Sequence, residues 1–268
     1  MNKEQTSGHK RNVINGLLTV TNIVSLSSNL IRIVLCCDKK LAVDPNWIGP
    51  HLKLLFPAEN SQDIIFPQTN EENKIIWQDG VRERVRTYSI RDYNENDNSL
   101  SVDFVVHQHG VATSWAQQAK IGDCIGLVAM GSKNRFDETV KFVLLGDIAA
   151  MPAICYTLEH LPAKQHVTAI IEVRDEQDKV TLNLPESATL SWLVTPKDQP
   201  SQLISTLTQL KLDTADSQLV FWGGMESSLA QSLRHYIKAQ FTALSGDCVR
   251  LISYWREGYA EGQFKHHD

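Results

Sequence analysis

The chain has 268 residues, of which 42% are hydrophobic and 21% are charged, a composition typical of a globular protein with room for two modest domains. Its net charge of −5 argues against wholesale nucleic-acid binding, and no apolar run is long enough to cross a bilayer. The polar segment 1–11 predicts a loose tail and not a signal peptide, so we expect a cytoplasmic protein without membrane insertion.

The five cysteines show no C-x-x-C spacing, and most lie in apolar strand-like or helix-like contexts. Because thiols in the cytosol are kept reduced, this pattern favours buried reduced cysteines over an iron–sulfur or zinc site. We expect no metal site built from protein side chains.

Short β-rich segments separated by polar turns characterise the first half of the chain. Their hydrophobic patterns predict strands at residues 17–24, 30–35, 51–57, 85–91, 100–107 and 124–129. The polar stretch 58–79 predicts a long surface loop, and the change of period at 112–119 predicts one short helix. Many antiparallel strands with a single helix indicate a small β-barrel, to which we assign residues 12–138.

Predicted strands and helices alternate in the second half. The strands are expected at 140–145, 166–173, 218–222 and 249–255, and the helices at 149–160, 203–212 and 227–241. Apolar runs such as 142–145 suit strands that are covered on both faces of a sheet. Residues 139–268 are therefore predicted to form an α/β, Rossmann-like domain, and the fold class is a β-barrel plus an α/β domain.

The strand at 85–91 carries the first pattern that points to a ligand. Read with a period of two, it places Arg86 and Tyr88 on one face. The guanidinium of an arginine is a rigid donor fork suited to phosphate, and a tyrosine offers a flat surface for a planar ring. The pair indicates a nucleotide cofactor, although these residues alone also fit a surface strand whose arginines keep it soluble.

The short helix at 112–119 follows Gly110 and has hydroxyl residues at its start. A helix N-terminus presents free backbone N–H groups and the positive end of the helix dipole, which together hold phosphate well. An ordinary capped helix between two strands is the alternative that these residues leave open.

The segment Arg86-Thr87-Tyr88-Ser89-Ile90-Arg91 resembles the R-x-Y-[ST]-x-R element of the siderophore-interacting proteins, flavin-dependent ferric-siderophore reductases within the ferredoxin reductase superfamily. The stretch 102–107, with the following Gly110 and Trp115-Ala116, is similar to the family's D-F-V-x-H and G-x-A-x-x-W-A elements. The closing Tyr254-Trp255-Arg256-Glu257-Gly258 is similar to G-Y-W-R-x-G, with Ser253 in the place of Gly. The resemblance runs from roughly Gly16 to Gly258.

The turn 146–153 resembles the family's G-D-E-T-A-x-P-A, but it has Ile148 and Ala149 where Glu and Thr usually stand. It follows a predicted strand, at the edge of the sheet where α/β folds bind ligands. Because two groups that could contact a pyridine nucleotide are missing, NADH, NADPH and a ferredoxin all stay open as the electron donor.

The resemblance implies a bound FAD, with Arg86 at the pyrophosphate, Tyr88 on the face of the isoalloxazine ring and Ser89 at a polar ring atom near N5. Residues that it assigns to cofactor binding are Arg86, Thr87, Tyr88, Ser89, Asp103, Phe104, Val105, His107, Gly110, Ala112, Thr113, Ser114, Trp115, Asp147, Ala149, Ala150, Tyr254 and Trp255.

The substrate that the resemblance implies is a ferric siderophore, which itself supplies the coordination sphere of the iron. Intact ferric catecholates are anionic, so a cationic rim above the flavin should concentrate them. We assign this role to four basic residues, each of which alone also fits an ordinary solvated charge: Lys53, Lys133, Arg135 and Arg256.

The function predicted in this way is a ferric-siderophore reductase. Electrons would pass from NAD(P)H or a ferredoxin through FAD to siderophore-bound Fe(III), with release of Fe(II) in the cytoplasm. Two alternatives stay open, namely a general flavin reductase or ferredoxin-linked oxidoreductase of the same fold, and a non-catalytic siderophore-binding protein. We expect a monomer.

Overall fold

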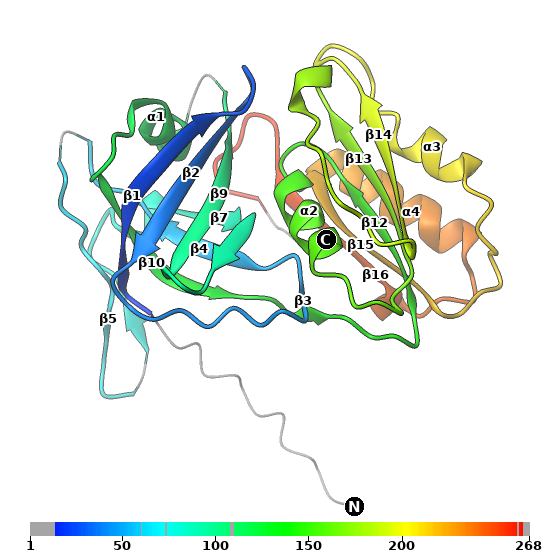
Figure 1. The fold of residues 1–268 in the computed structure, drawn as a ribbon, viewed down its shortest axis with the longest axis horizontal. Coiled ribbons are helices and arrows are strands. Elements are labelled where there is room, and N and C mark those ends of the chain that lie inside the picture. Colours follow the sequence, from blue (N-terminus) through cyan, green and yellow to red (C-terminus); the bar gives the residue numbers. More distant parts are fainter. Residues whose placement is uncertain (1–13, 60, 73, 108–109, 262, 265–268) are drawn as a thin grey trace, which may run out of the picture.

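The chain folds into an antiparallel β half and an α/β half that lie side by side, as seen in a computed structural model (Figure 1). The structure describes residues 14–59, 61–72, 74–107, 110–261 and 263–264. The predicted N-terminal tail and the first two residues of the 12–138 assignment lie outside this part of the chain. No helix in the described part is both long and apolar enough to cross a membrane.

The antiparallel half contains mainly strands. Its elements are β1 (Gly16–Ser25), β2 (Leu30–Cys37), β3 (Trp47–Ile48), β4 (His51–Leu55), β5 (Gln68–Thr69), β6 (Ile75–Ile76), the 3-10 turn η1 (Arg82–Arg84), β7 (Val85–Ser89), β8 (Asp92–Asn94), β9 (Ser99–Val105), α1 (Val111–Gln118), β10 (Cys124–Gly131) and β11 (Asn134–Arg135).

The α/β half follows directly. Its elements are β12 (Lys141–Gly146), α2 (Met151–Glu159), β13 (Val167–Val173), the 3-10 turn η2 (Glu176–Asp178), β14 (Ala188–Val194), α3 (Leu203–Gln209), β15 (Leu219–Glu226), α4 (Ser227–Gln240), the 3-10 turn η3 (Gly246–Cys248) and β16 (Val249–Trp255).

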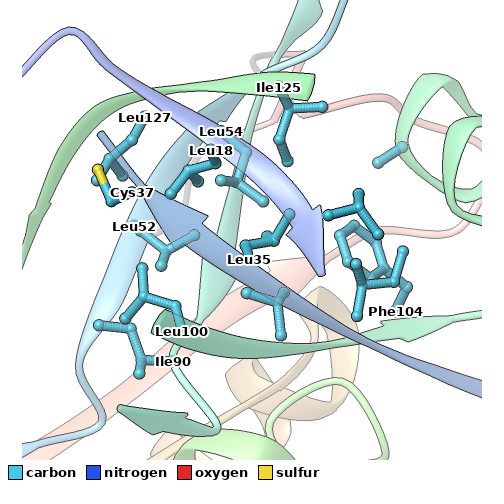
Figure 2. Packing of buried hydrophobic residues seen from close by; sticks show 14 of the residues in the cluster. Leu18, Leu35, Cys37, Leu52, Leu54, Ile90, Leu100, Phe104, Ile125 and Leu127 are labelled. Carbon is cyan, nitrogen blue, oxygen red and sulfur yellow. The ribbon is translucent and has the colours of Figure 1, made fainter. Parts of the chain in front are cut away.

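Alternating apolar residues fill the interior of the antiparallel sheet. In β1, Leu18 and Val20 are buried, and the residues between and beyond them are more exposed. Figure 2 shows how they meet leucines from the neighbouring strands, among them Leu35 of β2 and Leu54 of β4. Because full burial of one leucine is worth about 1.5–3 kcal/mol, this interior and not the polar turns stabilises the first half.

The antiparallel sheet has the strand order β7-β4-β10-β1-β2-β9-β8, and one segment joins its two ends. Strand β7 pairs with β4 at one end of this order, and the next strand in the chain, β8, pairs with β9 at the other end. Between the two strands, Ile90 donates its N–H to the carbonyl of Pro50 at 2.9 Å, and Arg91 donates to that of Ser101 at 2.8 Å. The sheet is therefore barrel-like, which confirms the predicted architecture of this half.

The α/β half is a five-stranded parallel sheet with the order β14-β13-β12-β15-β16. Residues of β12 alternate between two cores, since Phe142 and Leu144 pack in the core that contains α2, and Val143 and Leu145 pack in the core that contains α3 and α4. Helices thus cover both faces of the sheet, and the predicted α/β class is confirmed.

The structure corrects several local predictions. Strand β14 at the edge of the parallel sheet was not predicted, because its residues are only half-buried or exposed. The stretch 58–79 is more than a surface loop: it contains the β5–β6 ladder, and Ile64 and Phe66 pack on β10 beside Val128. All five cysteines are free thiols, but only Cys37 and Cys155 are buried.

Helix α2 holds the two halves together. The guanidinium of Arg91, the second arginine of the sequence motif, forms a bidentate ion pair with Glu159 at 2.5 and 3.0 Å. Gly49 donates its N–H to Thr157 Oγ1 at 3.0 Å, and the buried Tyr156 ring packs in the core of the antiparallel sheet. These contacts fix the position of α2 against the antiparallel sheet.

A second junction lies at the buried carboxylate of Asp178 in the α/β half. It accepts hydrogen bonds from Ser27 Oγ at 2.5 Å and from Asn29 Nδ2 at 3.1 Å, both in the β1–β2 turn. It also accepts the backbone N–H of Asp175 at 2.9 Å. A buried carboxylate with this many donors is well satisfied, so the β1–β2 turn is fixed to the α/β half.

Candidate functional site

Strand β7 carries the predicted phosphate-binding arginine and lies at one end of the antiparallel sheet order. Arg86 Nη1 donates to two backbone carbonyls, those of Glu83 at 2.7 Å and Val85 at 2.8 Å. Within the described residues, no hydrogen bond or ion pair involves its Nε or Nη2. The half-buried guanidinium is thus held in place on one side, while part of its donor fork is available to a phosphate.

Aromatic rings connect β7 to the start of α1. The centroid of the Tyr88 ring lies 4.5 Å from that of Phe104 on β9, which in turn lies 5.9 Å from that of Trp115 on α1. Phe56 completes the cluster at 5.5 Å from Trp115. Burial raises the pKa of the Tyr88 hydroxyl, so this side chain is neutral and offers a ring face with a polar tip.

The start of α1 has the geometry of a phosphate-binding helix end. Gly110 precedes the helix with φ +135°, and a Cβ at this position would lie only 2.9 Å from His107 Cε1, so only glycine fits. Among the described residues no side chain caps the first turn: the N-cap is Gly110, and the buried Thr113 hydroxyl accepts the N–H of His107 at 3.3 Å. Ala112 is also buried, whereas Ser114 is exposed. The first-turn N–H groups can therefore serve a ligand.

Three predicted residues on β9 have roles in the fold. Asp103 is buried and forms a bidentate ion pair with Arg32 on β2, at 2.7 and 2.9 Å. Phe104 is fully buried in the core, and Val105 packs against the core of the α/β half. These contacts fix the strand from which His107 and Gly110 follow.

The end of β16 meets β7 at the junction of the two halves. The Tyr254 ring lies against Gly224 on β15, where a Cβ would come within 2.4 Å of it. Burial raises the pKa of Tyr254 to about 12, against the lowering effect of the nearby side chain of the buried Ser89. The two sequence motifs farthest apart in the chain are therefore in direct contact.

Asp147 is the centre of the turn after β12. Its carboxylate accepts N–H groups from the backbone of Ala149 at 2.9 Å, from the backbone of Glu226 at 3.0 Å and from Trp255 Nε1 at 2.6 Å. Burial raises the pKa of Asp147 to about 6, against the lowering effect of these donors. The residue thereby ties three segments together at the carboxyl end of the sheet.

The two departures in this turn have a structural consequence. Ile148 is buried and contributes to the core beside α2, as does Ala150. Ala149 is half-buried and its N–H is bound to Asp147. The turn therefore presents no side-chain hydroxyl or carboxylate of its own at positions 148–150.

Two of the four predicted basic residues lie together. Lys53 on β4 donates to Thr87 Oγ1 on β7. Burial lowers the pKa of the nearby His51, and the charges of Lys53 and Lys133 lower it further. Gly131 pairs with His51 in the register of β10 and β4, and Lys133 follows Gly131 by two residues, so Lys53 and Lys133 both lie near this end of β4.

The other two basic residues lie apart. Arg135 pairs with Asp44, and its neighbour Asn134 accepts from Arg250 Nη1 at 3.1 Å at the start of β16. Arg256 instead follows the end of β16. Since β16 has seven residues, it spans roughly 20 Å at about 3.3 Å per residue, which separates Arg135 from Arg256.

Glu261, beyond the last strand, is a site residue that the sequence analysis did not identify. It accepts the backbone N–H of Thr87 at 2.7 Å and the Thr87 hydroxyl at 2.5 Å, and it pairs with Lys53 at 3.1 Å. Although burial acts to raise it, the pKa of Glu261 is held below its usual range by Lys53 and Thr87. No local pattern predicts this contact, because 174 positions separate Glu261 from Thr87.

Comparison with known proteins identifies the family. Residues 19–134 match the siderophore-interacting FAD-binding domain, and residues 139–258 match the siderophore-interacting protein domain. The chain belongs to the siderophore-interacting protein family.

Relatives of this siderophore-interacting protein include two that are named as ferric reductases. The ferric vibriobactin reductase ViuB of Vibrio cholerae is 28% identical over 239 residues, which are 88% of this chain and 87% of the relative. The NADPH-dependent ferric-chelate reductase of Escherichia coli is 27% identical over 242 residues, 89% of this chain and 91% of the relative. The crystal structure of a siderophore utilization protein from T. fusca superposes with a TM-score of 0.79 at 26% identity, covering 96% of this chain and 100% of the other.

The residues present fit FAD. Arg86 and the start of α1 offer donors for a pyrophosphate, and the Tyr88 ring follows Arg86 on the same face of β7. Among the described residues, no group of three or more His, Cys, Asp and Glu side chains could hold a metal ion.

Proposed function

We propose that this siderophore-interacting protein is an FAD-dependent ferric-siderophore reductase. The observation that carries the proposal is that β7 packs through aromatic rings toward α1 and lies beside the end of β16, in a chain whose halves both match this family. The names of the ferric vibriobactin reductase and the ferric-chelate reductase support the same reaction class.

Each motif residue has a definite task in this proposal. Arg86 and the first-turn N–H groups of α1 bind the pyrophosphate, and Tyr88 and Ser89 orient the ring system. FAD supplies the ability to accept two electrons from a donor and to release them singly to Fe(III). Asp147 positions Trp255 and the segment that follows it.

The iron needs no protein ligand, because the siderophore provides its coordination sphere. Fe(II) is held less tightly than Fe(III) by hard oxygen donors, so reduction favours release of the metal. The protein's contribution is therefore to place the complex near the flavin by charge and shape. A cytoplasmic location and a monomeric state remain predictions, as does a ferredoxin as donor.

The first testable prediction concerns the electron donor. Since Ile148 is buried and Ala149 has no polar side chain, we expect that the protein does not strongly prefer NADPH to NADH. We also expect that a protein such as a reduced ferredoxin can act as the electron donor. Anaerobic stopped-flow reduction of the flavin by each donor measures this preference. Fast, saturable reduction by micromolar NADPH with NADH inert would contradict the prediction.

The second prediction concerns the charge of the substrate. Attraction between exposed charges is screened within about 10 Å at 0.1 M salt, so the KM for a ferric tris-catecholate complex should rise with ionic strength. Lys53→Ala and Arg256→Ala should each raise it by at most about fivefold at low salt, because an exposed ion pair is worth about 0.2–1 kcal/mol. Reduction of the flavin by the donor should stay unchanged.

Arg135→Ala is the matched control for the charge prediction. It removes the same charge as Arg256→Ala, but from the opposite end of β16, where Arg135 already pairs with Asp44. We expect its KM to equal that of the unaltered protein. Equal effects of the two arginine variants would show that only net charge matters and that no local cationic surface exists.

A further inference from the structure

The segment that follows β16 turns back onto the antiparallel sheet. Trp255 is anchored by Asp147 at 2.6 Å, and a turn follows in which Tyr259 donates its N–H to the Arg256 carbonyl at 3.1 Å. The Arg256 guanidinium lies 4.3 Å from the centroid of the Tyr259 ring. We call residues 256–261 the return segment. In Figure 1 this red part of the chain lies between the two halves.

The return segment ends at Glu261, whose carboxylate spans both strands of the β4–β7 pair. Lys53 and Thr87 are directly opposite each other in the register of these strands. Glu261 accepts both the N–H and the hydroxyl of Thr87, and it forms an ion pair with the Lys53 ammonium. One side chain of the C-terminal segment thus covers the edge of the strand that carries the flavin motif.

The ion pair lies where solvent can reach it. The Lys53 side chain is 41% exposed, and that of Glu261 is 18% exposed. An anion that approaches Lys53 therefore meets an ammonium that is accessible but already paired. Lys133 follows Gly131 by two residues, and Gly131 pairs with His51 on β4, so the positive charge of Lys133 remains near the Lys53–Glu261 pair when an anion has neutralised Lys53.

We propose that Glu261 is a specificity-determining residue which competes with the substrate for Lys53. The inference rests on the proposed reductase function and names the substrate class that the site selects. A polyanionic ferric complex displaces the carboxylate from Lys53 and keeps the attraction of Lys133, whereas a neutral complex gains nothing from the exchange. Because Lys53 and the Thr87 hydroxyl share Oε1 of Glu261, loss of the Lys53 contact weakens the hold of the return segment on β7.

Binding measurements on the FAD-loaded, oxidised protein test the competition. Quenching of tryptophan fluorescence by a ferric tris-catecholate at low salt gives the Kd. Glu261→Gln removes the competing charge, so we expect the Kd to fall about fivefold, the upper end for a partly exposed ion pair. Glu257→Gln makes the same change of net charge at an exposed position of the return segment, and we expect its Kd to change less than twofold.

A double-mutant cycle separates competition from a merely structural role. In the Lys53→Met variant, the Glu261 carboxylate has no ammonium group to pair with. Adding Glu261→Gln to this variant should therefore leave its Kd for the ferric tris-catecholate unchanged. A neutral ferric trihydroxamate should bind all four proteins of the cycle equally. The ratio of flavin to protein absorbance checks that each variant retains FAD.

Hydrogen exchange of the unaltered protein provides a readout that needs no variant. We expect the Thr87 amide and the return segment to exchange faster when the ferric tris-catecholate is saturating, and to be unaffected by the neutral complex. If the protein binds and reduces the polyanion, but Glu261→Gln leaves its Kd unchanged or exchange does not increase, Glu261 only secures β7 and the reductase function stands. If no ferric complex binds or is reduced, the proposed function fails, and the competition fails with it.

Discussion

Replacing Arg86 with alanine is expected to weaken FAD binding by roughly 1.5–3 kcal/mol, about 10- to 150-fold in Kd. The loss follows from the charge-assisted hydrogen bonds that the free part of the guanidinium can donate to a pyrophosphate. Titration of the apoprotein with FAD, followed by quenching of flavin fluorescence, measures the Kd. Arg86→Lys should be intermediate, because an ammonium keeps the charge but not the donor fork.

Arg82→Ala is the matched control for this experiment. Arg82 is an exposed arginine in the η1 turn just before β7, so its removal changes the net charge of the same region by the same amount. We expect the FAD affinity of this variant to stay within twofold of the original. If Arg86→Ala also keeps the original affinity, Arg86 does not bind the pyrophosphate, and its bonds to Glu83 and Val85 are its whole role.

Asp147→Ala should lower the free energy of unfolding by about 3–5 kcal/mol. The substitution leaves three N–H donors without their acceptor, and each buried unsatisfied donor costs about 1–3 kcal/mol, less where water enters the vacated space. Asp147→Asn should cost less, about 1–3 kcal/mol, because its amide oxygen still accepts from some of these donors, while its amide nitrogen leaves at least one unsatisfied. Urea unfolding followed by circular dichroism gives both values.

Asp198→Ala serves as the control, since it removes an exposed carboxylate from the same half of the protein. We expect a change below about 0.5 kcal/mol for it. An Asp147→Ala protein as stable as this control would mean that the turn after β12 does not depend on the carboxylate. The assignment of Asp147 as the residue that positions Trp255 would then be wrong.

The fold was largely predictable because hydrophobic period and burial agree over most of the chain. In β12, four successive apolar residues predict a strand covered on both faces, and the two cores on either side of the sheet confirm it. Strand β14 was missed because it lies at the edge of the sheet, where Thr189 and Ser191 alternate with half-buried residues. This alternation of polar and apolar residues is typical of a strand, but the polar segments on either side of it made the strand hard to recognise.

The candidate site was predictable only where its residues are contiguous. The R-x-Y-S motif and the Gly110 helix start are local patterns, and the structure places both beside the same aromatic cluster. The contact of Glu261 with Thr87 and the separation of Arg135 from Arg256 depend on how the halves pack. The residue pattern of a single strand or helix does not predict such contacts between distant segments, so they are visible only in the tertiary structure.

The contacts between the halves have a consequence for the site. Arg91 with Glu159, and Asp178 with Ser27, join the two halves. Because Ser89 already contacts Tyr254 in this arrangement, the flavin strand and the end of β16 need no domain closure to meet.

A single-turnover experiment tests the central claim most directly. The purified protein is reduced anaerobically until its flavin is colourless, and a ferric tris-catecholate siderophore is then added together with a chelator that reports Fe(II). The account predicts that the flavin absorbance returns as two equivalents of Fe(II) form per FAD, and that the flavin released by denaturation is FAD. Reduced flavin that persists in the presence of the ferric complex, or a purified protein that contains and binds no FAD, would contradict it.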